Sequence, residues 1–307
     1  MNDNMKQPVV AVFTKNRTNA AYEGARLGAD RVAARMGGKA VHYVPDTPDD
    51  VEEQVALVDR ALAARPDAFV FVPVHLTAMN ASILKINAAG IPLVNLISPT
   101  GVGERVCFIG SDDRALAAEV TRYVARRLPD GAKVVILEGH PASGTTHERL
   151  RGIQEALAYF PGLAVVASAR GDYQRDIACE AVSGLLKQGI RFDAVIASND
   201  TMALGALDAL DRLQPSVALP PVVGVNAIPE AIAAIKAGRL LATVDFDAMK
   251  MACIATEAAF RHLRGEAVPP SITLPVQVVD ASNCARWDRP YDARECPDWD
   301  EVTRSRN

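Results

Sequence analysis

The fold of this chain is best predicted from the stretch Ala197-Ser198-Asn199-Asp200-Thr201-Met202-Ala203-Leu204-Gly205-Ala206. Residues 192–196 before it have the apolar pattern of a short buried strand. Met202, Ala206, Leu207 and Leu210 recur at helical spacing, and Asp200 is placed to cap that helix. The stretch thus predicts polar residues at the carboxyl end of a parallel strand, where α/β proteins bind small ligands.

Asn199 is the first candidate binding residue. Its side-chain amide can donate and accept a hydrogen bond at once, which suits a hydroxyl group better than a phosphate or a metal. The alternative is that Asn199 and Asp200 only close a strand-to-helix turn, and this stretch alone favours neither interpretation.

Composition narrows the class of protein. The 307 residues exceed one typical domain, and 49% hydrophobic with 23% charged residues is a globular composition. A net charge of −4 and an aromatic content of 5% argue against a nucleic-acid partner. No apolar run approaches the roughly 20 residues of a membrane-spanning helix, so we expect no membrane insertion.

The amino terminus and the cysteines indicate the compartment. Residues 1–7 are polar and carry no signal-peptide core, so the chain is expected to be periplasmic with its leader absent, or cytoplasmic if Met1 is the true start. None of the five cysteines forms a CxxC pair, and no metal or cofactor is expected. Cys253 falls in an apolar helical pattern, which predicts a buried thiol. Cys284 and Cys296 could form a disulfide in an oxidising compartment, a bond that spacing alone cannot establish.

Strand and helix patterns alternate from end to end, which predicts parallel sheets covered on both faces. The alternation restarts after Ser111, so two similar α/β lobes are expected. The last strand is predicted over Ile272–Val279. Residues 282–307 break the pattern and hold Trp287 and Trp299, which we expect to pack on the second lobe or on the hinge.

Several segments, in order along the chain, resemble type I periplasmic binding proteins of the ribose-binding, sugar-transporter group over residues 8–279. They are Glu23-Gly24-Ala25, Gly90-Ile91-Pro92, Ile109-Gly110-Ser111-Asp112-Asp113, His147-Glu148-Arg149 with Gly152, Asn199-Asp200, Val223-Gly224-Val225-Asn226 and Gly238 through Thr243. The resemblance implies two doubly wound parallel-sheet lobes joined by a hinge of three crossings. The lobes would comprise residues 8–111 with 247–273 and residues 112–246 with 274–281, and 282–307 would form a tail wrapped on the body.

The resemblance also implies ligand-binding residues in the second lobe. Arg149 matches a sugar-contacting arginine, although an arginine on an amphipathic helix is otherwise a solvent-exposed charge. Tyr173 matches an aromatic residue that stacks on the sugar ring, and Asn199 matches a hydroxyl-binding asparagine. Asn226 stands where the group usually has aspartate, and Phe246 replaces a glutamine at the hinge.

The first lobe departs from the pattern of the group. Its first loop, residues 14–20, lacks the two aromatic residues that sandwich the sugar, and Leu96-Ile97-Ser98 replaces an Asp-Arg pair. Asn16 is expected to keep a polar role. Lys15, Arg17 and His75, together with Arg149, would suit a sugar acid if two of these four faced the ligand. Otherwise Lys15 and Arg17 point to solvent at the rim.

The sequence also bears on two other classes of function. The carboxylate pairs Asp112/Asp113 and Asp245/Asp247 resemble glycosidase pairs, but they stand at strand-to-helix junctions where capping explains them, so no enzyme is expected. A soluble ligand sensor of the same fold, signalling through a partner protein and lacking a DNA-binding domain, is the second hypothesis. The first hypothesis is that the chain is a monomeric substrate-binding protein of an ABC-type importer. It would capture a sugar, polyol or sugar acid in an interlobe cleft by hinge closure and pass it to a membrane permease.

Overall fold

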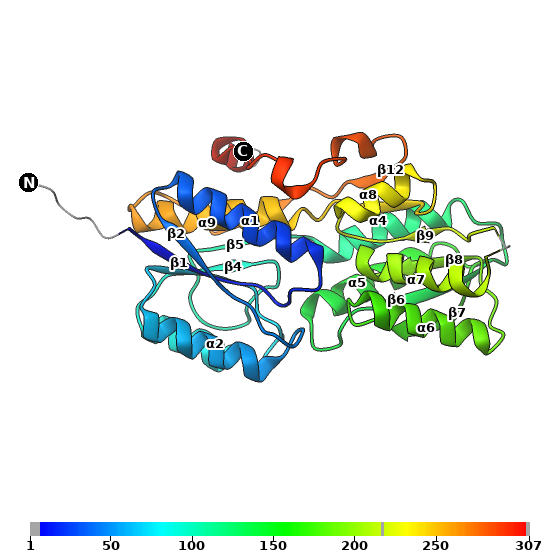
Figure 1. The fold of residues 1–307 in the computed structure, drawn as a ribbon, viewed down its shortest axis with the longest axis horizontal. Coiled ribbons are helices and arrows are strands. Elements are labelled where there is room, and N and C mark those ends of the chain that lie inside the picture. Colours follow the sequence, from blue (N-terminus) through cyan, green and yellow to red (C-terminus); the bar gives the residue numbers. More distant parts are fainter. Residues whose placement is uncertain (1–6, 216–217, 305–307) are drawn as a thin grey trace, which may run out of the picture. The chain divides into compact units, whose positions relative to one another are not determined.

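The computed structural model describes residues 7–215 and 218–304. These residues form two units, each built around a six-stranded sheet (Figure 1). Unit 1 comprises the described parts of Met1–Gly110, Ala248–Leu274 and Tyr291–Asn307, and unit 2 those of Ser111–Asp247 and Pro275–Pro290. The chain passes from one unit to the other after Gly110, Asp247, Leu274 and Pro290, so residues 282–307 are divided between the two units.

The sheet of unit 1 has the strand order β11-β5-β4-β3-β1-β2, and its pairs among β1 to β5 are parallel. Its strands are β1 (Val9–Phe13), β2 (Lys39–Tyr43), β3 (Ala68–Phe71), β4 (Leu93–Leu96), β5 (Cys107–Ser111) and β11 (Ser271–Leu274). Its helices are α1 (Ala20–Arg35), α2 (Val51–Ala64), α3 (Asn80–Ala88), α9 (Ala248–Leu263) and α10 (Trp299–Arg304), with a short 3₁₀ turn η2 (Tyr291–Ala293). Figure 1 shows α1 and α9 along one face of this sheet and α2 along the other.

Local sequence explains these elements. Strand β1 reads Val-Val-Ala-Val-Phe and is buried from Val10 onward, as expected for a central parallel strand covered on both faces. Helix α2 is capped by Asp50, whose side chain accepts a hydrogen bond from the Glu53 N–H at 2.8 Å. Aromatic rings fill the core: Phe13 stacks on Tyr43 with ring centroids 4.9 Å apart.

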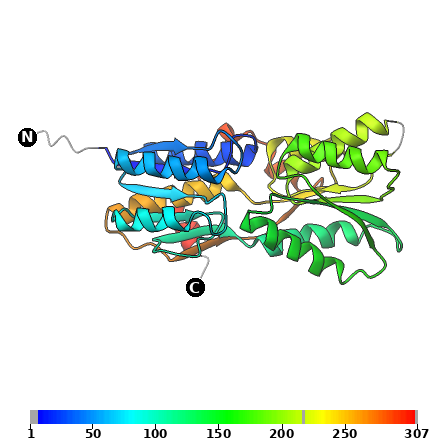
Figure 2. The ribbon, with the colours of Figure 1, turned by 90° about the horizontal axis from the view of Figure 1, so that it is seen from below.

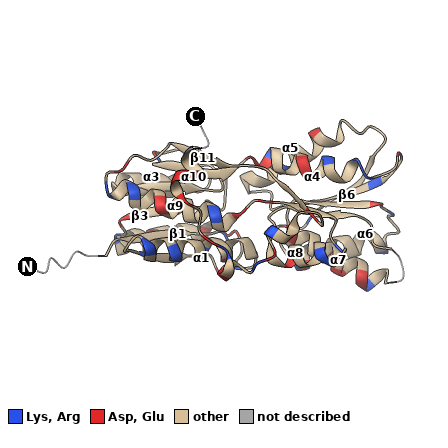
Figure 3. Ribbon diagram, turned by 90° about the horizontal axis from the view of Figure 1, so that it is seen from above, with Lys and Arg blue, Asp and Glu red and all other residues tan. Residues whose placement is uncertain are grey.

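Unit 2 repeats the design with the strand order β12-β10-β9-β8-β6-β7, in which only β12 is antiparallel to its neighbour. Its strands are β6 (Lys133–Glu138), β7 (Ala164–Arg170), β8 (Ala194–Ala197), β9 (Val222–Val223), β10 (Ala242–Val244) and β12 (Val278–Asp280). Its helices are α4 (Asp113–Ala125), α5 (Gly144–Leu157), α6 (Arg175–Lys187), α7 (Asp200–Leu213) and α8 (Pro229–Lys236), with the 3₁₀ turn η1 (Cys284–Arg286). Helices α4 and α5 cover one face, and α6, α7 and α8 the other (Figures 2 and 3). The predicted fold class, two doubly wound α/β units, is confirmed.

The strand order places the functional edge of each sheet. In both sheets the first strand in chain order lies between two others, β1 between β3 and β2 and β6 between β8 and β7. Chain progression reverses direction at these strands, and open α/β sheets bind ligands beside such a switch point, at the carboxyl ends of the strands. The loops after β1 and β3 carry Asn16 and His75, whereas those after β6 and β8 lead to Arg149 and Asn199.

Two expectations about the carboxyl-terminal region are wrong. The strand predicted over Ile272–Val279 is two strands, β11 and β12, one in each sheet, and Pro275 between them lacks the N–H that a continuous ladder would need. Trp299 packs within unit 1, where the Arg261 guanidinium lies 4.8 Å from its ring centroid. An arginine on α9 can cover an indole as an apolar side chain would, because guanidinium groups stack on aromatic faces.

Candidate functional site

Arg149 is buried at the centre of the candidate site in unit 2. Only 3% of its side chain is exposed, so the alternative of a solvent-exposed charge is wrong. Its Nε donates to Asp113 Oδ1 at 2.7 Å, and its Nη1 donates to the Ser198 carbonyl oxygen at 2.6 Å. Its guanidinium carbon lies 5.0 Å from the Phe246 ring centroid and 6.0 Å from that of Tyr173. The fold therefore brings together Arg149, Tyr173 and Phe246, which are far apart in the sequence.

Tyr173 is held in an unusual conformation in the loop between β7 and α6. Its φ of 61° is left-handed, and its ring is almost fully buried. Its hydroxyl accepts a hydrogen bond from Thr146 Oγ1 at 2.9 Å and lies 3.2 Å from Thr145 Oγ1. Burial raises the pKa of this phenol, so it stays neutral. Gly139 makes room for the ring, because a Cβ at Gly139 would lie 2.1 Å from Tyr173 Cζ.

Asn199 caps α7, which begins one residue later at Asp200. Its Oδ1 accepts a hydrogen bond from the Met202 N–H at 2.9 Å. The prediction that Asp200 forms this cap is wrong, because Asp200 is already the first helical residue and its carboxylate turns inward. The Nδ2 of Asn199 is buried and has no hydrogen-bond partner among the described residues.

Asn226 supplies a complementary group. It follows β9 with φ 130°, and its Oδ1 is likewise buried without a partner in the described part of the chain. The Asp200 N–H donates to the Val225 carbonyl at 2.8 Å, so the segments that carry Asn199 and Asn226 are hydrogen-bonded neighbours. One unused donor and one unused acceptor therefore lie on adjacent segments at the carboxyl edge of one sheet. Each such atom costs free energy comparable to a lost hydrogen bond, and these two are among nine in the described residues that share this state.

Asp200 forms hydrogen bonds that connect the segment of Asn199 with neighbouring segments of unit 2. Its Oδ1 accepts from Thr243 Oγ1 at 2.6 Å, and its Oδ2 accepts from the Ile228 N–H at 3.0 Å. Full burial raises the pKa of this carboxyl group to about 6, against the opposing effect of these donors and of the Arg149 charge. The bonds of Asp200 connect α7, β10 and the start of α8, so the carboxyl group is a structural part of the site.

The residues predicted in unit 1 have local partners or lie in solvent. Asn16 is buried, with Nδ2 donating to Asp49 Oδ2 at 2.9 Å and Oδ1 accepting from the Asn19 N–H at 3.0 Å. His75 Nδ1 accepts from the N–H groups of Thr77 and Ala78, both at 3.1 Å. Arg17 is exposed, as the rim alternative expects, whereas Lys15 is buried, against that alternative.

Backbone strain marks the same edges of both sheets. Among the described non-glycine residues with positive φ are Ile97 after β4 (65°), Tyr173 after β7 and Asn226 after β9. A branched side chain such as that of Ile97 rarely adopts this conformation, and strain of this kind persists where surrounding contacts enforce it. Ile97 is held by its N–H, which donates to the Ile109 carbonyl at 2.8 Å.

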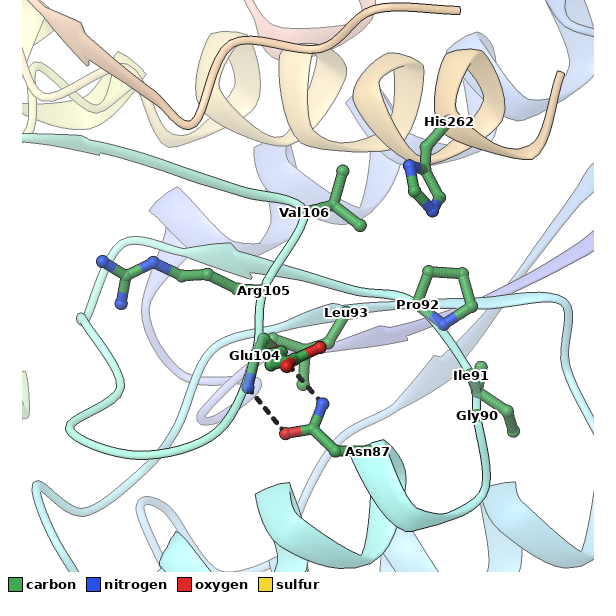
Figure 4. Close-up of a pocket in the computed structure, with 9 residues that line it drawn as sticks. All are labelled: Asn87, Gly90, Ile91, Pro92, Leu93, Glu104, Arg105, Val106 and His262. Atoms are coloured by element: carbon green, nitrogen blue, oxygen red, sulfur yellow. Dashed lines mark hydrogen bonds between the residues drawn. The ribbon is translucent and has the colours of Figure 1, made fainter. Parts of the chain in front are cut away.

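A separate pocket of about 330 Å³ lies in unit 1 (Figure 4). It is lined by Asn87, Gly90, Ile91, Pro92, Leu93, Glu104, Arg105, Val106 and His262. It contains none of the predicted site residues and opens beside the starts of β4 and β5, the amino ends of these strands. Ligands of open α/β sheets bind at the opposite, carboxyl ends, so this pocket is a weaker candidate.

The distribution of charged and metal-ligating side chains limits the kinds of site that the described residues can form. Figure 3 shows both signs of charge scattered over the helices of each unit. Residues 7–215 and 218–304 bring no three His, Cys, Asp or Glu side chains together as a metal site would require. None of the helices in these ranges is long and apolar enough to span a bilayer.

Comparison with known proteins places this geometry in a family. A model of the periplasmic binding protein domain matches residues 10–267. The chain belongs to this family. Its members bind substrates and do not convert them, which agrees with the expectation of a protein without catalytic activity.

Individual relatives cover nearly the whole family domain. The ribose import binding protein of Bacillus subtilis is 28% identical over 275 residues, which are 90% of this chain and 88% of that protein. An ABC transporter solute-binding protein from Bacillus halodurans with bound myo-inositol is similar with a TM-score of 0.84 at 25% identity, covering 94% of this chain and 99% of that one. Another from Actinobacillus succinogenes, with bound D-allose, has the same TM-score and identity and covers 91% and 100%.

The sequence missed several residues that build the site. Asp113 was interpreted as a cap, but Asp112 is the cap of α4 and Asp113 pairs with Arg149. The hydroxyls of Thr145 and Thr146 were not singled out, although a Thr-Thr pair opening a helix after a strand was a usable signal. The sequence holds no signal for the role of Thr243, because a threonine inside a strand pattern is common.

Proposed function

We propose that this chain is the substrate-binding protein of an ABC-type importer, acting in the periplasm on a neutral polyhydroxy compound, a sugar or a polyol. The observation that carries the proposal is an unused donor, Asn199 Nδ2, and an unused acceptor, Asn226 Oδ1, on two segments that are hydrogen-bonded to each other. A hydroxyl group can accept from the first and donate to the second, whereas an ionised carboxylate can only accept. Relatives with bound D-allose and myo-inositol support the same ligand class.

Each remaining residue has a role in this proposal. The rings of Tyr173 and Phe246 would cover the apolar C–H face of the ligand, replacing the aromatic pair missing from the first loop of unit 1. Arg149, whose guanidinium carbon lies 5.0 Å from the Phe246 ring centroid, would donate to a further hydroxyl of the ligand. The buried Asp113 and Ser198 contacts would fix the guanidinium plane before the ligand arrives, which lowers the entropy lost on binding.

Charge balance favours a neutral ligand over a sugar acid. The Arg149 charge is compensated by Asp113 at 2.7 Å, so an arriving carboxylate would compete with one already present. In unit 1, His75 Nδ1 accepts backbone hydrogen bonds and Arg17 is exposed. These positions offer little support for the alternative of a sugar acid.

A thermal-shift screen tests the ligand class. The full chain is compared in the presence of D-ribose, D-allose, myo-inositol, D-ribonate and D-gluconate. A ligand at a thousand times its dissociation constant stabilises the folded state by about 4 kcal/mol, a clear rise in the unfolding midpoint. We expect rises with neutral compounds. A rise confined to the two aldonates would overturn the neutral class, and silence across the panel would favour the sensor hypothesis.

A matched pair of variants tests the site itself. Asn199→Ser keeps a capping oxygen for α7 but removes the Nδ2 donor, so affinity by calorimetry should fall about tenfold or more. Asn19→Ser is the control, because Asn19 caps α1 through Oδ1 at 3.0 Å from the Ala21 N–H. Equal affinities in the two variants would remove Asn199 from the site. Hinge closure, the permease partner and the monomeric state remain predictions of the sequence.

A further inference from the structure

The carboxyl-terminal segment, residues 291–304, is attached to unit 1 by specific contacts. Arg31 on α1 donates from Nη1 to the Arg294 carbonyl at 2.7 Å and from Nη2 to the Asp292 carbonyl at 2.5 Å. The Tyr291 ring lies against Gly24, where an added Cβ would be 2.6 Å from Tyr291 Cε1. Two backbone carbonyls and the Tyr291 ring thus anchor the segment on α1.

A cysteine of this segment, Cys296, lies against a cysteine of α9, Cys253. Cys253 on α9 is buried, with 1% of its surface exposed, and Cys296 in the segment is partly exposed. Their sulfurs lie 3.1 Å apart, closer than the roughly 3.5–4.0 Å at which nonbonded heavy atoms usually pack. Val32 and Met249 belong to the same buried apolar cluster as Cys253, and Cys296 packs against it. A covalent bond of about 2.05 Å would need only a small movement of the two side chains.

The surroundings also favour the reactive form of Cys296. The hydrogen bond from Cys253 and the charges of Arg35 and Arg31 lower the pKa of Cys296 to about 7, against the opposing effects of burial and of Glu257. The thiolate is the form that attacks disulfides, so an accessible thiol with this pKa is a competent nucleophile near neutral pH. Cys253, which is buried directly behind it, is positioned as the second thiol of a pair.

We propose that Cys253 and Cys296 are an oxidisable pair whose disulfide fastens the carboxyl-terminal segment to α9. The oxidant is a disulfide, either a small molecule or a thiol–disulfide oxidoreductase. The Cys296 thiolate attacks one sulfur of that disulfide, its S–S bond breaks, and one thiolate leaves. Cys253 then loses its proton and attacks Cys296 Sγ, releasing the second thiolate. The protein loses two protons and two electrons, which reduce the oxidising disulfide to two thiols.

The position of this bond in the chain gives it a structural consequence. Residues 253 and 296 are 43 positions apart, and the chain between them leaves unit 1 after Leu274 and returns at Tyr291. The disulfide would therefore close a loop that runs through unit 2. Closing a loop of this length restricts the unfolded chain and should raise the unfolding midpoint by several degrees. This pairing differs from the Cys284–Cys296 bond that the sequence left open.

Peptide mapping of the oxidised full chain tests the proposal. The reduced protein is incubated with oxidised glutathione, quenched with N-ethylmaleimide and digested with trypsin without reductant. Trypsin separates the three relevant cysteines into peptides 251–261, 265–286 and 295–304. We expect 251–261 joined to 295–304 with the loss of two hydrogens. A bond between 265–286 and 295–304, or glutathione retained on Cys296 with Cys253 alkylated, would overturn it.

Thermal unfolding supplies a second readout and a matched control. Wild type and Cys284→Ser should both melt at higher temperature after oxidation than after reduction, because neither lacks the proposed pair. Cys296→Ser should show no such difference. A difference that persists in Cys296→Ser, or is absent from the wild type despite a folded circular dichroism spectrum, would contradict the proposed disulfide.

Discussion

Replacing Arg149 with methionine removes a buried guanidinium group while keeping an unbranched side chain in its place. Arg149 and Asp113 expose only 3% and 9% of their side chains, so water cannot replace the lost contact. The Asp113 carboxylate loses a donor at 2.7 Å, and the Ser198 carbonyl loses one at 2.6 Å. Removing one partner of a buried ion pair costs about 3–5 kcal/mol, so we expect a loss of unfolding free energy in that range.

Arg114, which follows Asp113 on α4, provides a control. Arg114 on α4 pairs with Glu155 on α5 at 2.5 Å, so both ion pairs join the same two helices. The side chains of Arg114 and Glu155 are 49% and 41% exposed. Solvent and salt screen such a pair, and Arg114→Met should leave stability nearly unchanged. Burial is then the main variable that differs between the two substitutions.

A double variant separates stability from binding. Arg149→Met with Asp113→Leu replaces the whole buried pair by apolar side chains, an exchange that is often neutral or stabilising. Urea unfolding followed by circular dichroism should show recovery of most of the lost stability, while calorimetry with the ligand found by the screen shows no recovery of binding. Equal losses for Arg149→Met and Arg114→Met, or no recovery in the double variant, would refute the reasoning.

Three further predictions concern the same edge of unit 2. Because the pKa of Asp200 is raised from 3.8 to about 6, the folded state binds its proton more tightly, and this group lowers stability by about 2 kcal/mol as pH rises from 4 to 7. In Asp200→Asn, urea unfolding across that range should lack this component. Gly139→Ala should displace the Tyr173 ring and weaken ligand binding at least tenfold by calorimetry, whereas Gly184→Ala, with no atom near the added Cβ, should not. Asn226→Gly should relieve strain at φ 130° and raise the unfolding midpoint while lowering affinity, and a change of both in the same direction would contradict its assignment.

The fold was largely predictable because its pattern is local. Each buried parallel strand is a short apolar run, and each covering helix has its own period, so alternation is visible without any long-range contact. The prediction failed at Ile272–Val279, where one apolar run serves two sheets. Pro275 was the local indication of a break, but only the pairing of β11 and β12 with different strands shows where each half belongs.

The candidate site was less predictable because burial depends on the packing of distant segments. The helical pattern around Arg149 permits either a solvent-exposed or a buried side chain, and Asp113, which decides between them, is 36 residues away. Asp112 and Asp113 are equivalent in sequence as caps, yet Asp112 accepts a bond from the Ala115 N–H, whereas Asp113 pairs with Arg149. The position of a helix cap can be predicted from sequence only to within about one residue. Sequence therefore cannot show which of two adjacent aspartates caps the helix and which pairs with an arginine.

Asn199 shows why the choice between a turn and a binding site was not a choice between exclusive roles. A carboxamide has separate acceptor and donor atoms, and capping α7 engages only the acceptor, Oδ1. An aspartate there would cap equally well but bring no donor, and a serine would bring a single hydroxyl group. The buried Nδ2 costs free energy in the absence of a ligand, whereas the cap holds it in place. The same residue therefore stabilises the helix and keeps a donor oriented for a hydroxyl group, at the end of the strand where the fold directs ligands.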